Sequence, residues 1–132
     1  MSDAGRFTFP AVAESLSTAR STVRGVLTAH NHASRELDIN IAVGEILQNV
    51  VRYGFEGGDP AGEFIMEFTF EADRLRITIT DNAPPSDPEA WSAEHRKPEE
   101  GGHGLTLVTA IAHQVSFKML ENGNQAKLEF LL

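Results

Sequence analysis

The chain has 132 residues and a formal net charge of −8, with 41% hydrophobic and 23% charged residues. These values are ordinary for a globular protein, and the length predicts one domain, residues 1–132, with a single buried core. Lys and Arg are scattered singly, so the basic surface of a direct nucleic-acid binder is missing, and no apolar run approaches the ~20 residues of a membrane span.

The chain contains no cysteine, which excludes disulfides, thiol nucleophiles and cysteine-based metal sites. Its first residues lack the basic segment and apolar core of a signal peptide, so we expect a cytoplasmic protein. An acidic protein of this kind would hold an anion through local backbone groups, a metal ion or a few cations. Small ligands are therefore favoured over polyanions.

The first part of the chain predicts one strand and two helices. Residues 6–9 alternate apolar and polar and stop at Pro10, as expected for an edge strand. Apolar spacing over residues 11–29 predicts an amphipathic helix. A second helix is predicted from residue 39 to about residue 54, with Asp38 as its N-cap.

Two polar pairs stand out in this region. His30 and His32 lie in the connector between the helices, where a solvated linker is favoured over a metal site because no third ligand cluster is evident. Glu45 and Asn49 are four residues apart and share one face of the second helix, nearly opposite its core stripe. That face is either an exposed surface or one side of a site, and the pair alone favours the exposed surface.

The middle of the chain predicts a β-hairpin that ends in an acid. Residues 64–71 and 74–80 alternate apolar and polar residues on either side of a short turn. Asp81 follows, so its carboxylate either terminates the strand or points into a ligand cleft. Residues 82–103 are polar and proline-rich, and a connection of this length is typical of a lid or binding loop.

Three glycines within residues 101–104 precede a predicted helix over residues 105–112. Glycine allows a ligand to approach the backbone closely, and a helix start presents unpaired N–H groups to an anion. Taken alone, this stretch is compatible with a plain turn or with a phosphate site. Two more alternating strands follow, over residues 115–119 and 126–132.

The predicted order is strand, helix, helix, strand, strand, lid, helix, strand, strand. Its one-sided alternation favours an α+β fold, a two-layer sandwich with a mixed, mostly antiparallel sheet and three helices on one face. A cleft between the layers would be lined by Glu45, Asn49, Asp81 and the glycine turn.

From about Asp38 onward, this ordered set resembles the GHKL ATPase superfamily, which includes gyrase, histidine kinases and MutL. The runs over residues 81–88 and 101–105 are most similar to the anti-sigma-factor serine/threonine kinases. The resemblance implies a Bergerat-type ATP-binding fold, binding of ATP or ADP with Mg²⁺, and transfer of phosphate to a protein serine.

The resemblance also implies roles for individual residues. Glu45 matches the general base, Asn49 a magnesium ligand, and Asp81 the acceptor for the adenine amino group. The remaining nucleotide contacts would come from the turn after Asp81 and from the glycine stretch, namely Ala83, Gly101, Gly102, His103, Gly104 and Leu105.

The implied partners are an anti-anti-sigma protein of the STAS class, a sigma factor or both, and a second copy of the chain in a homodimer. Ala83 and His103 stand where related sequences have glycine and often arginine. They motivate a second hypothesis, a nucleotide-gated protein-binding module with little or no phosphotransfer. A third hypothesis is an unrelated α+β domain that binds no nucleotide.

Overall fold

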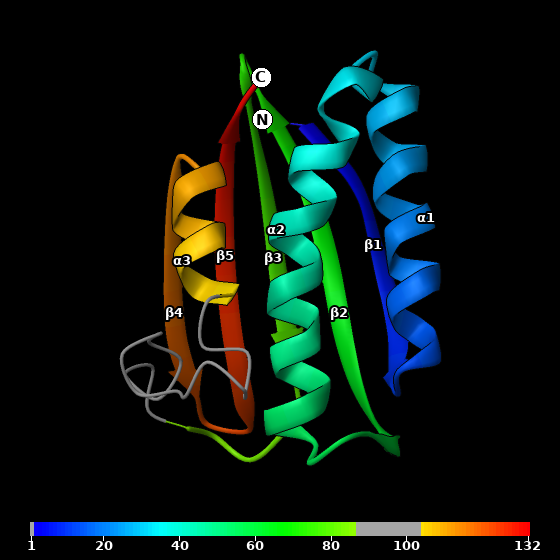
Figure 1. The fold of residues 1–132 in the computed structure, drawn as a ribbon, viewed down its shortest axis with the longest axis vertical. Coiled ribbons are helices and arrows are strands. Elements are labelled where there is room, and N and C mark those ends of the chain that lie inside the picture. The colour runs from blue at the N-terminus through cyan, green and yellow to red at the C-terminus, as the bar shows by residue number, and fades with distance from the viewer. Residues whose placement is uncertain (1, 87–103) are drawn as a thin grey trace.

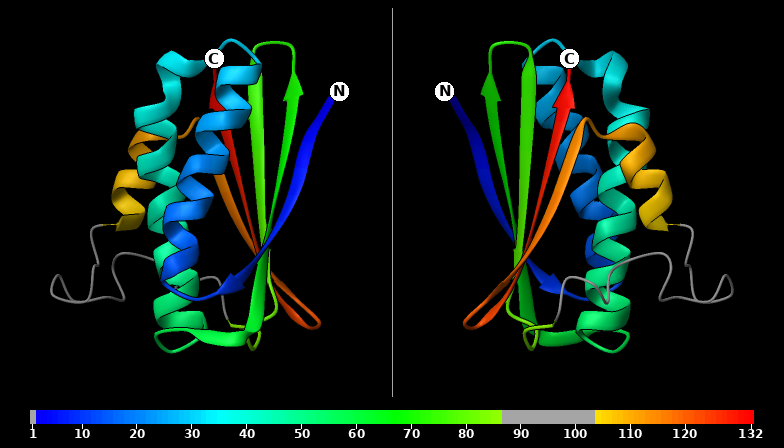
Figure 2. Two further views of the ribbon diagram at one scale, coloured as in Figure 1. Left: turned by 90° about the vertical axis from the view of Figure 1, so that its right-hand side faces the viewer. Right: turned by 90° about the vertical axis from the view of Figure 1, so that its left-hand side faces the viewer.

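The structure is a computed structural model that describes residues 2–86 and 104–132. It has two layers, a five-stranded sheet and a layer of helices that covers one of its faces (Figures 1 and 2). The strands are β1 (Ser2–Ala11), β2 (Asp59–Glu71), β3 (Arg74–Asp81), β4 (Gln114–Leu120) and β5 (Gly123–Leu131). The helices are α1 (Glu14–Ala29), α2 (Glu36–Asn49) and α3 (Gly104–Ile111), with short helical turns η1 (Ala33–Arg35) and η2 (Val50–Gly54) beside α2.

The strand order is β1-β2-β3-β5-β4, and all of the pairings between these strands are antiparallel. The strand β1 lies at one edge, as its proline predicted, and extends further than the predicted residues 6–9. The helix α2 packs between α1 and α3 (Figure 1). The predicted α+β sandwich with three helices on one face is therefore confirmed.

The period-two alternation in the sequence places one set of side chains against the helices. Phe64, Met66 and Phe68 of β2 are at most 1% exposed, and Ile77 and Ile79 of β3 continue this layer. Each such buried side chain contributes about 1.5–3 kcal/mol relative to an exposed one. The opposite face of the sheet is polar, and there Arg76 donates to Glu129 at 2.9 Å.

The predicted start of the second helix is wrong. The helix α2 begins at Glu36, directly after η1, and no side chain caps it. Asp38 lies inside its first turn, where a carboxylate favours the positive end of the helix dipole without accepting a capping bond. At the other end, η2 continues the helical path to Gly54, where the second helix was expected to end.

Several element ends meet at one end of the sandwich. The end of α2, the end of β3 and the start of β5 all lie toward the lower end in Figure 1. Within the described ranges, none of the helices combines the length and apolar character needed to cross a bilayer.

Candidate functional site

Asp81 is the last residue of β3 and is only 6% exposed. It is buried because it continues the inward alternation of Ile77 and Ile79. Its Oδ1 accepts hydrogen bonds from the backbone N–H of Ala83 at 3.0 Å and from Nδ2 of Asn124 at 3.1 Å. The acid therefore lies beneath the helix layer with fixed hydrogen-bond partners.

Burial raises the pKa of the Asp81 carboxyl above its usual value. Hydrogen bonds from the Asn124 side chain and from the backbone of Ala83 and Asn124 act in the opposite direction and lower it. Burial has the larger effect, so the charged form is held at a cost in free energy. A carboxylate kept at such a cost is a candidate binding group.

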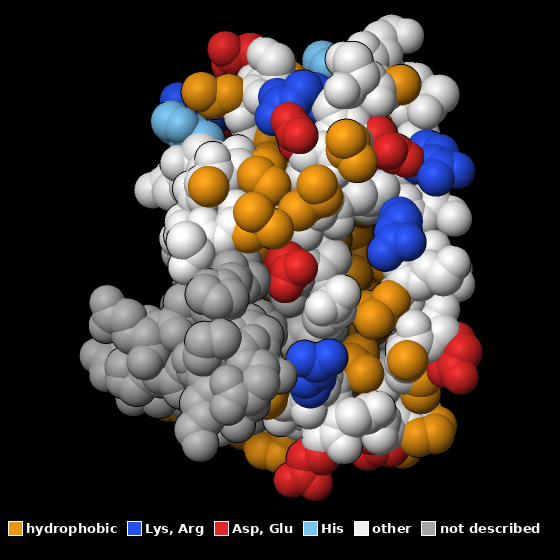
Figure 3. Space-filling model, in the orientation of Figure 1, with side chains coloured by type: hydrophobic (Ala, Val, Ile, Leu, Met, Phe, Trp, Pro, Cys, Tyr) orange, Lys and Arg blue, Asp and Glu red, His pale blue; other side chains and the backbone are white. Residues whose placement is uncertain are grey.

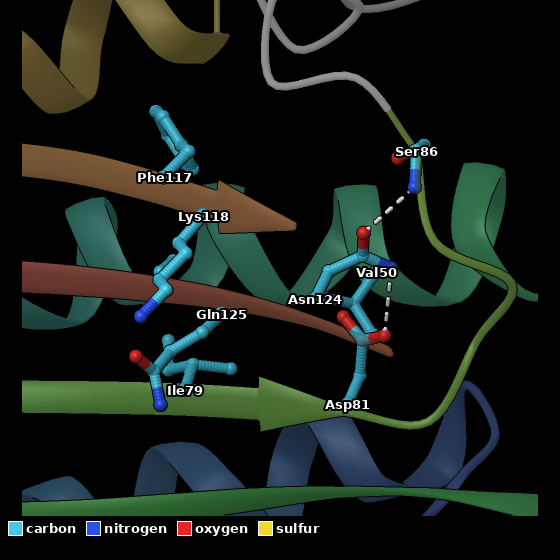
Figure 4. Close-up of a pocket in the computed structure, with 9 residues that line it drawn as sticks. Val50, Ile79, Asp81, Ser86, Phe117, Lys118, Asn124 and Gln125 are labelled. Atoms are coloured by element: carbon cyan, nitrogen blue, oxygen red, sulfur yellow. Dashed lines mark hydrogen bonds between the residues drawn. The ribbon is translucent and has the colours of Figure 1, made fainter. Parts of the chain in front are cut away.

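Asn124, the second residue of β5, supports this acid and the chain that leaves it (Figure 4). Its Nδ2 also donates to the carbonyl of Pro84 at 3.2 Å, and its Oδ1 accepts the backbone N–H of Ser86 at 2.9 Å. The sequence interpretation left Asn124 in the connection between the strands predicted over residues 115–119 and 126–132, and did not identify it as a site residue. The available signal was its position two residues before Ala126, on the buried side of the alternation.

A small cavity of about 10 Å³ lies beside Asp81 (Figure 4). Val50 comes from the start of η2, Ile79 from β3, and Phe117 and Lys118 from β4. This volume holds about one water molecule, so a ring-sized ligand would require the cavity to widen. The lining combines apolar side chains with the buried acid and with polar side chains from β4 and β5.

Asn49 is the last residue of α2 and is 6% exposed, so of the two alternatives left open for its helix face, the exposed surface does not apply to this residue. Its neighbour Val50 lines the cavity at Asp81. A Cβ added at Gly54, the end of η2, would lie 3.3 Å from the Cβ of Ala83, which is itself 1% exposed. The end of α2 is thus packed against the turn that follows β3.

Glu45, one turn before Asn49, is half-buried and lines a different space. It borders an open groove of about 360 Å³ between α1 and α2, together with Arg20 and Gln48. Figure 3 shows hydrophobic side chains gathered on this helix-covered face, and the exposed apolar residues Leu37 and Ile41 line the same groove. The carboxylate is therefore open to a large partner.

Comparison with known proteins identifies the domain. Residues 9–130 match the family described as histidine kinase-like ATPase domain. The chain belongs to this family.

Among curated relatives of this ATPase domain, the serine-protein kinase RsbW of Staphylococcus epidermidis is 30% identical over 118 residues, which cover 81% of this chain and 74% of that protein. RsbW of Listeria monocytogenes is 28% identical over 116 residues, covering 80% of this chain and 73% of the relative. The name serine-protein kinase belongs to those relatives.

Solved structures share the fold of this ATPase domain. The RsbU and RsbW domains of Rv1364c from Mycobacterium tuberculosis superpose with a TM-score of 0.68 at 18% identity, covering 97% of this chain and 31% of that longer chain. The catalytic domain of histidine kinase ThkA gives a TM-score of 0.54 at 15% identity, covering 96% and 95%. At these identities the likeness shows the fold alone.

Part of the predicted site falls outside the described residues. This holds for Gly101, Gly102 and His103, and for all but residues 82–86 of the predicted lid. Gly104 and Leu105 are the first two residues of α3.

His30 and His32 lie at the opposite end of the sandwich and are not mere linker residues. Their rings stack on Phe70, with centroid distances of 4.3 Å for His30 and 5.8 Å for His32. Among the described residues, no three His, Cys, Asp or Glu side chains cluster to hold a metal ion. The histidines therefore pack against the sheet.

Proposed function

We propose that this ATPase domain is an ATP- and Mg²⁺-dependent protein serine/threonine kinase of the anti-sigma-factor type. It would phosphorylate a STAS-class antagonist and regulate a sigma factor by exchanging partners. The observation that carries the proposal is that Asp81 and Asn49 are both buried toward one end of the sandwich, while the half-buried Glu45, one turn before Asn49, borders an open groove. Similarity to RsbW serine-protein kinases supports the reaction type.

In this proposal, Asp81 recognises the base. An ionised carboxylate only accepts hydrogen bonds, so it pairs with the exocyclic amino group of adenine. The apolar neighbours Val50, Ile79 and Phe117 supply surfaces for the ring. Ala83 closes the turn beside the base and packs against Gly54, which fixes the distance between α2 and β3 at this point.

Asn49 fits a magnesium ligand because its amide oxygen is a hard, uncharged donor on the last turn of α2. Since the described residues contain no carboxylate cluster, oxygens of the nucleotide phosphates and water would complete the coordination. Bound magnesium would supply charge neutralisation at the phosphates. The phosphates themselves would be held by Gly101, Gly102, His103, Gly104 and Leu105 at the start of α3.

Glu45 would act as the general base, accepting the proton of a substrate serine hydroxyl as the oxygen attacks the γ-phosphate in line. Its groove also contains the exposed apolar residues Ile41 and Leu37, one and two turns earlier on α2. An apolar surface beside a base suits a protein substrate better than a small molecule. The STAS-class partner would dock there.

The test is phosphotransfer with ATP, Mg²⁺ and a candidate STAS-class protein. We expect Glu45→Ala to lower the rate by about 10²–10⁴-fold without loss of ATP affinity, because the base acts on the serine proton. Gln48→Ala is the matched control, since Gln48 lines the same groove and carries no charge. A wild-type protein that binds ATP and transfers no phosphate, or an equally fast Glu45→Ala variant, would refute the kinase assignment.

The tight packing at Ala83 favours a second candidate, a nucleotide-gated binding module with little or no phosphotransfer. The methyl group of Ala83 fills the space beside Gly54, and the cavity at Asp81 is small. A protein partner whose affinity changes between ATP and ADP, with no phosphoserine formed over hours, would support this function over the kinase. If calorimetry detects no binding of ATP or of ADP, both the kinase and the nucleotide-gated module are excluded.

A further inference from the structure

Asn124 is one of the few buried polar residues of the described chain, at 5% exposed, and it lies directly beside Asp81. We propose that Asn124 is a positioning residue that sets the orientation of the Asp81 carboxylate and anchors the turn at Pro84 and Ser86. Through these contacts it makes the site selective for a 6-amino purine over a 6-oxo purine. This inference rests on the proposed nucleotide-binding function.

The Asn124 amide is fully engaged in a single orientation. It has two N–H donors and one carbonyl acceptor. Nδ2 donates to Asp81 Oδ1 at 3.1 Å and to the Pro84 carbonyl at 3.2 Å, while Oδ1 accepts the Ser86 N–H at 2.9 Å. The reversed orientation would point the amide oxygen at two acceptors, so the contacts themselves define the assignment.

The strand register, rather than a loop, brings Asn124 to the acid. Asp81 and Asn124 are directly paired residues of β3 and β5. A Cβ at Gly123 would lie 1.9 Å from the carbonyl oxygen of Asp81, so only glycine allows β5 to begin this close to β3. The amide is thereby held on two rigid elements, which suits a group that orients another side chain.

The bonds to Asp81 explain how selectivity would arise. Asn124 Nδ2 and the Ala83 N–H both donate to Oδ1, and in this proposal the carboxylate held in this way accepts a further hydrogen bond from the ligand. These donors favour the ionised carboxylate, whereas burial raises its pKa and favours the neutral acid. The ionised form accepts from a 6-amino group and repels a 6-oxo oxygen, but a protonated acid would donate to the 6-oxo group.

Other groups beside the acid limit the size of the effect. Without Asn124, the backbone N–H of Ala83 would still donate to the carboxylate. Lys118 of β4 is the other charged residue among the described side chains that line the cavity, and its ammonium points away from Asp81 (Figure 4). Val50, the first residue of η2, is apolar. Removal of Asn124 should therefore weaken the selectivity for the amino purine without abolishing it.

The same amide ties base recognition to the chain that leaves the site. Asn124 is bonded at once to the acid and, through Pro84 and Ser86, to the turn that follows it. A base that draws Asp81 forward would pull on the amide and so on this turn. Without Asn124, a movement of Asp81 on binding of the base would no longer be transmitted to the turn at Pro84 and Ser86.

The experiment compares ATP with inosine triphosphate, which differs at the 6-position of the base. Affinities of both are measured by calorimetry between pH 6 and pH 8 for the wild type, Asn124→Ala and Asn82→Ala. Asn82 is the matched control, because its Oδ1 accepts the Glu63 N–H at 2.8 Å in the same turn and does not touch the Asp81 carboxylate. For Asn124→Ala we expect the preference for ATP to shrink roughly tenfold, and more at low pH, because a bond to a charged group is lost.

The outcomes separate the two proposals. A wild type that binds neither nucleotide, or both equally, overturns the proposed base recognition and this inference with it. A wild type that prefers ATP, with an unchanged ratio and pH profile in Asn124→Ala, overturns this inference alone, even if both affinities fall. If circular dichroism shows that Asn124→Ala does not fold, Asn124→Thr replaces it; one hydroxyl cannot make all three bonds, so a smaller loss of preference is expected.

Discussion

The two ends of the sandwich differ in where they place their polar side chains. The buried polar residues of the described chain are Ser15, Asn49, Asp81 and Asn124. They lie near the start of α1, the end of α2, the end of β3 and the start of β5, which all face the lower end in Figure 1. At the opposite end, polar contacts such as the ion pair between Arg24 and Glu36 are exposed to solvent.

Under the proposed function, this difference separates the end that binds the nucleotide from an end whose contacts only hold the fold together. A buried polar group lowers stability unless its bonds are satisfied, so a fold does not gather such groups without a reason. At the opposite end, the rings of His30 and Phe70 stack and Arg35 donates to the carbonyl of Leu131, contacts that only hold elements together. The comparison predicts that mutations at the two ends will change the free energy of unfolding by different amounts and with a different dependence on pH.

The largest effect is expected for Gly123→Ala at the Asp81 end. The new Cβ would lie 1.9 Å from the backbone oxygen of Asp81, so β3 and β5 would have to separate. We expect the free energy of unfolding to fall by about 3 kcal/mol, measured by urea denaturation.

Gly25→Ala in α1 is the matched control for Gly123→Ala. No atom lies within 4 Å of a Cβ built there, and alanine is the better helix former. We expect the free energy of unfolding to rise by about 0.5–1 kcal/mol. Equal effects of the two substitutions would show that the close strand approach at Gly123 is not required.

A smaller, pH-dependent effect is expected for Asp81→Asn. Burial raises the pKa of this carboxyl in the folded state above its unfolded value. Its contribution to stability is therefore fully present below the unfolded pKa and is lost as the pH rises through the folded pKa. Relative to the wild type, the Asn variant should gain stability as the pH increases from 4 to 8, although it should lose adenine nucleotide affinity.

Urea denaturation of both proteins across that pH range measures the difference. A difference that is independent of pH would mean that ionisation of Asp81 is not opposed by the fold. A difference of the opposite sign would mean that the hydrogen bonds from Asn124 and Ala83 outweigh burial.

The smallest effect is expected at the opposite end, for Arg24→Ala. Arg24 Nε lies 2.6 Å from Glu36 Oε1, but the arginine side chain is 63% exposed. Solvent screens such a pair, so the loss should be about 0–1 kcal/mol and should vanish in concentrated salt. A double-mutant cycle with Glu36→Ala isolates the pair. A coupling energy well above about 1 kcal/mol would contradict the expectation that this exposed ion pair contributes little to stability.

Much of the fold was predictable because periodicity records which side of an element is buried. The alternation of Phe64, Met66 and Phe68 predicted an inward face of β2, and the structure confirms it. The start of α2 was not predictable from Asp38, because η1 leads directly into the helix and no capping side chain is used. Helix ends depend on local backbone geometry that composition does not record.

The site was predictable in part. Asp81 stood out because an acid ends an apolar strand, and the structure buries it as a site residue would be. The spacing of Glu45 and Asn49 alone favoured an exposed face, whereas the resemblance implied a magnesium ligand at Asn49; the structure buries Asn49, and its role stays a prediction. The roles of Glu45 and of the glycine stretch over residues 101–104 stay predictions.

The sequence by itself determined the layers of this protein, the edge position of β1 and the family to which it belongs, because hydrophobic period and motif order are local properties of the chain. Only the tertiary structure decided that Asn124 supports Asp81. These residues are 43 positions apart, and their contact depends on the pairing of β3 with β5. Which strands pair depends on how the whole core packs. A local pattern in the chain therefore could not predict which amide side chain would contact Asp81.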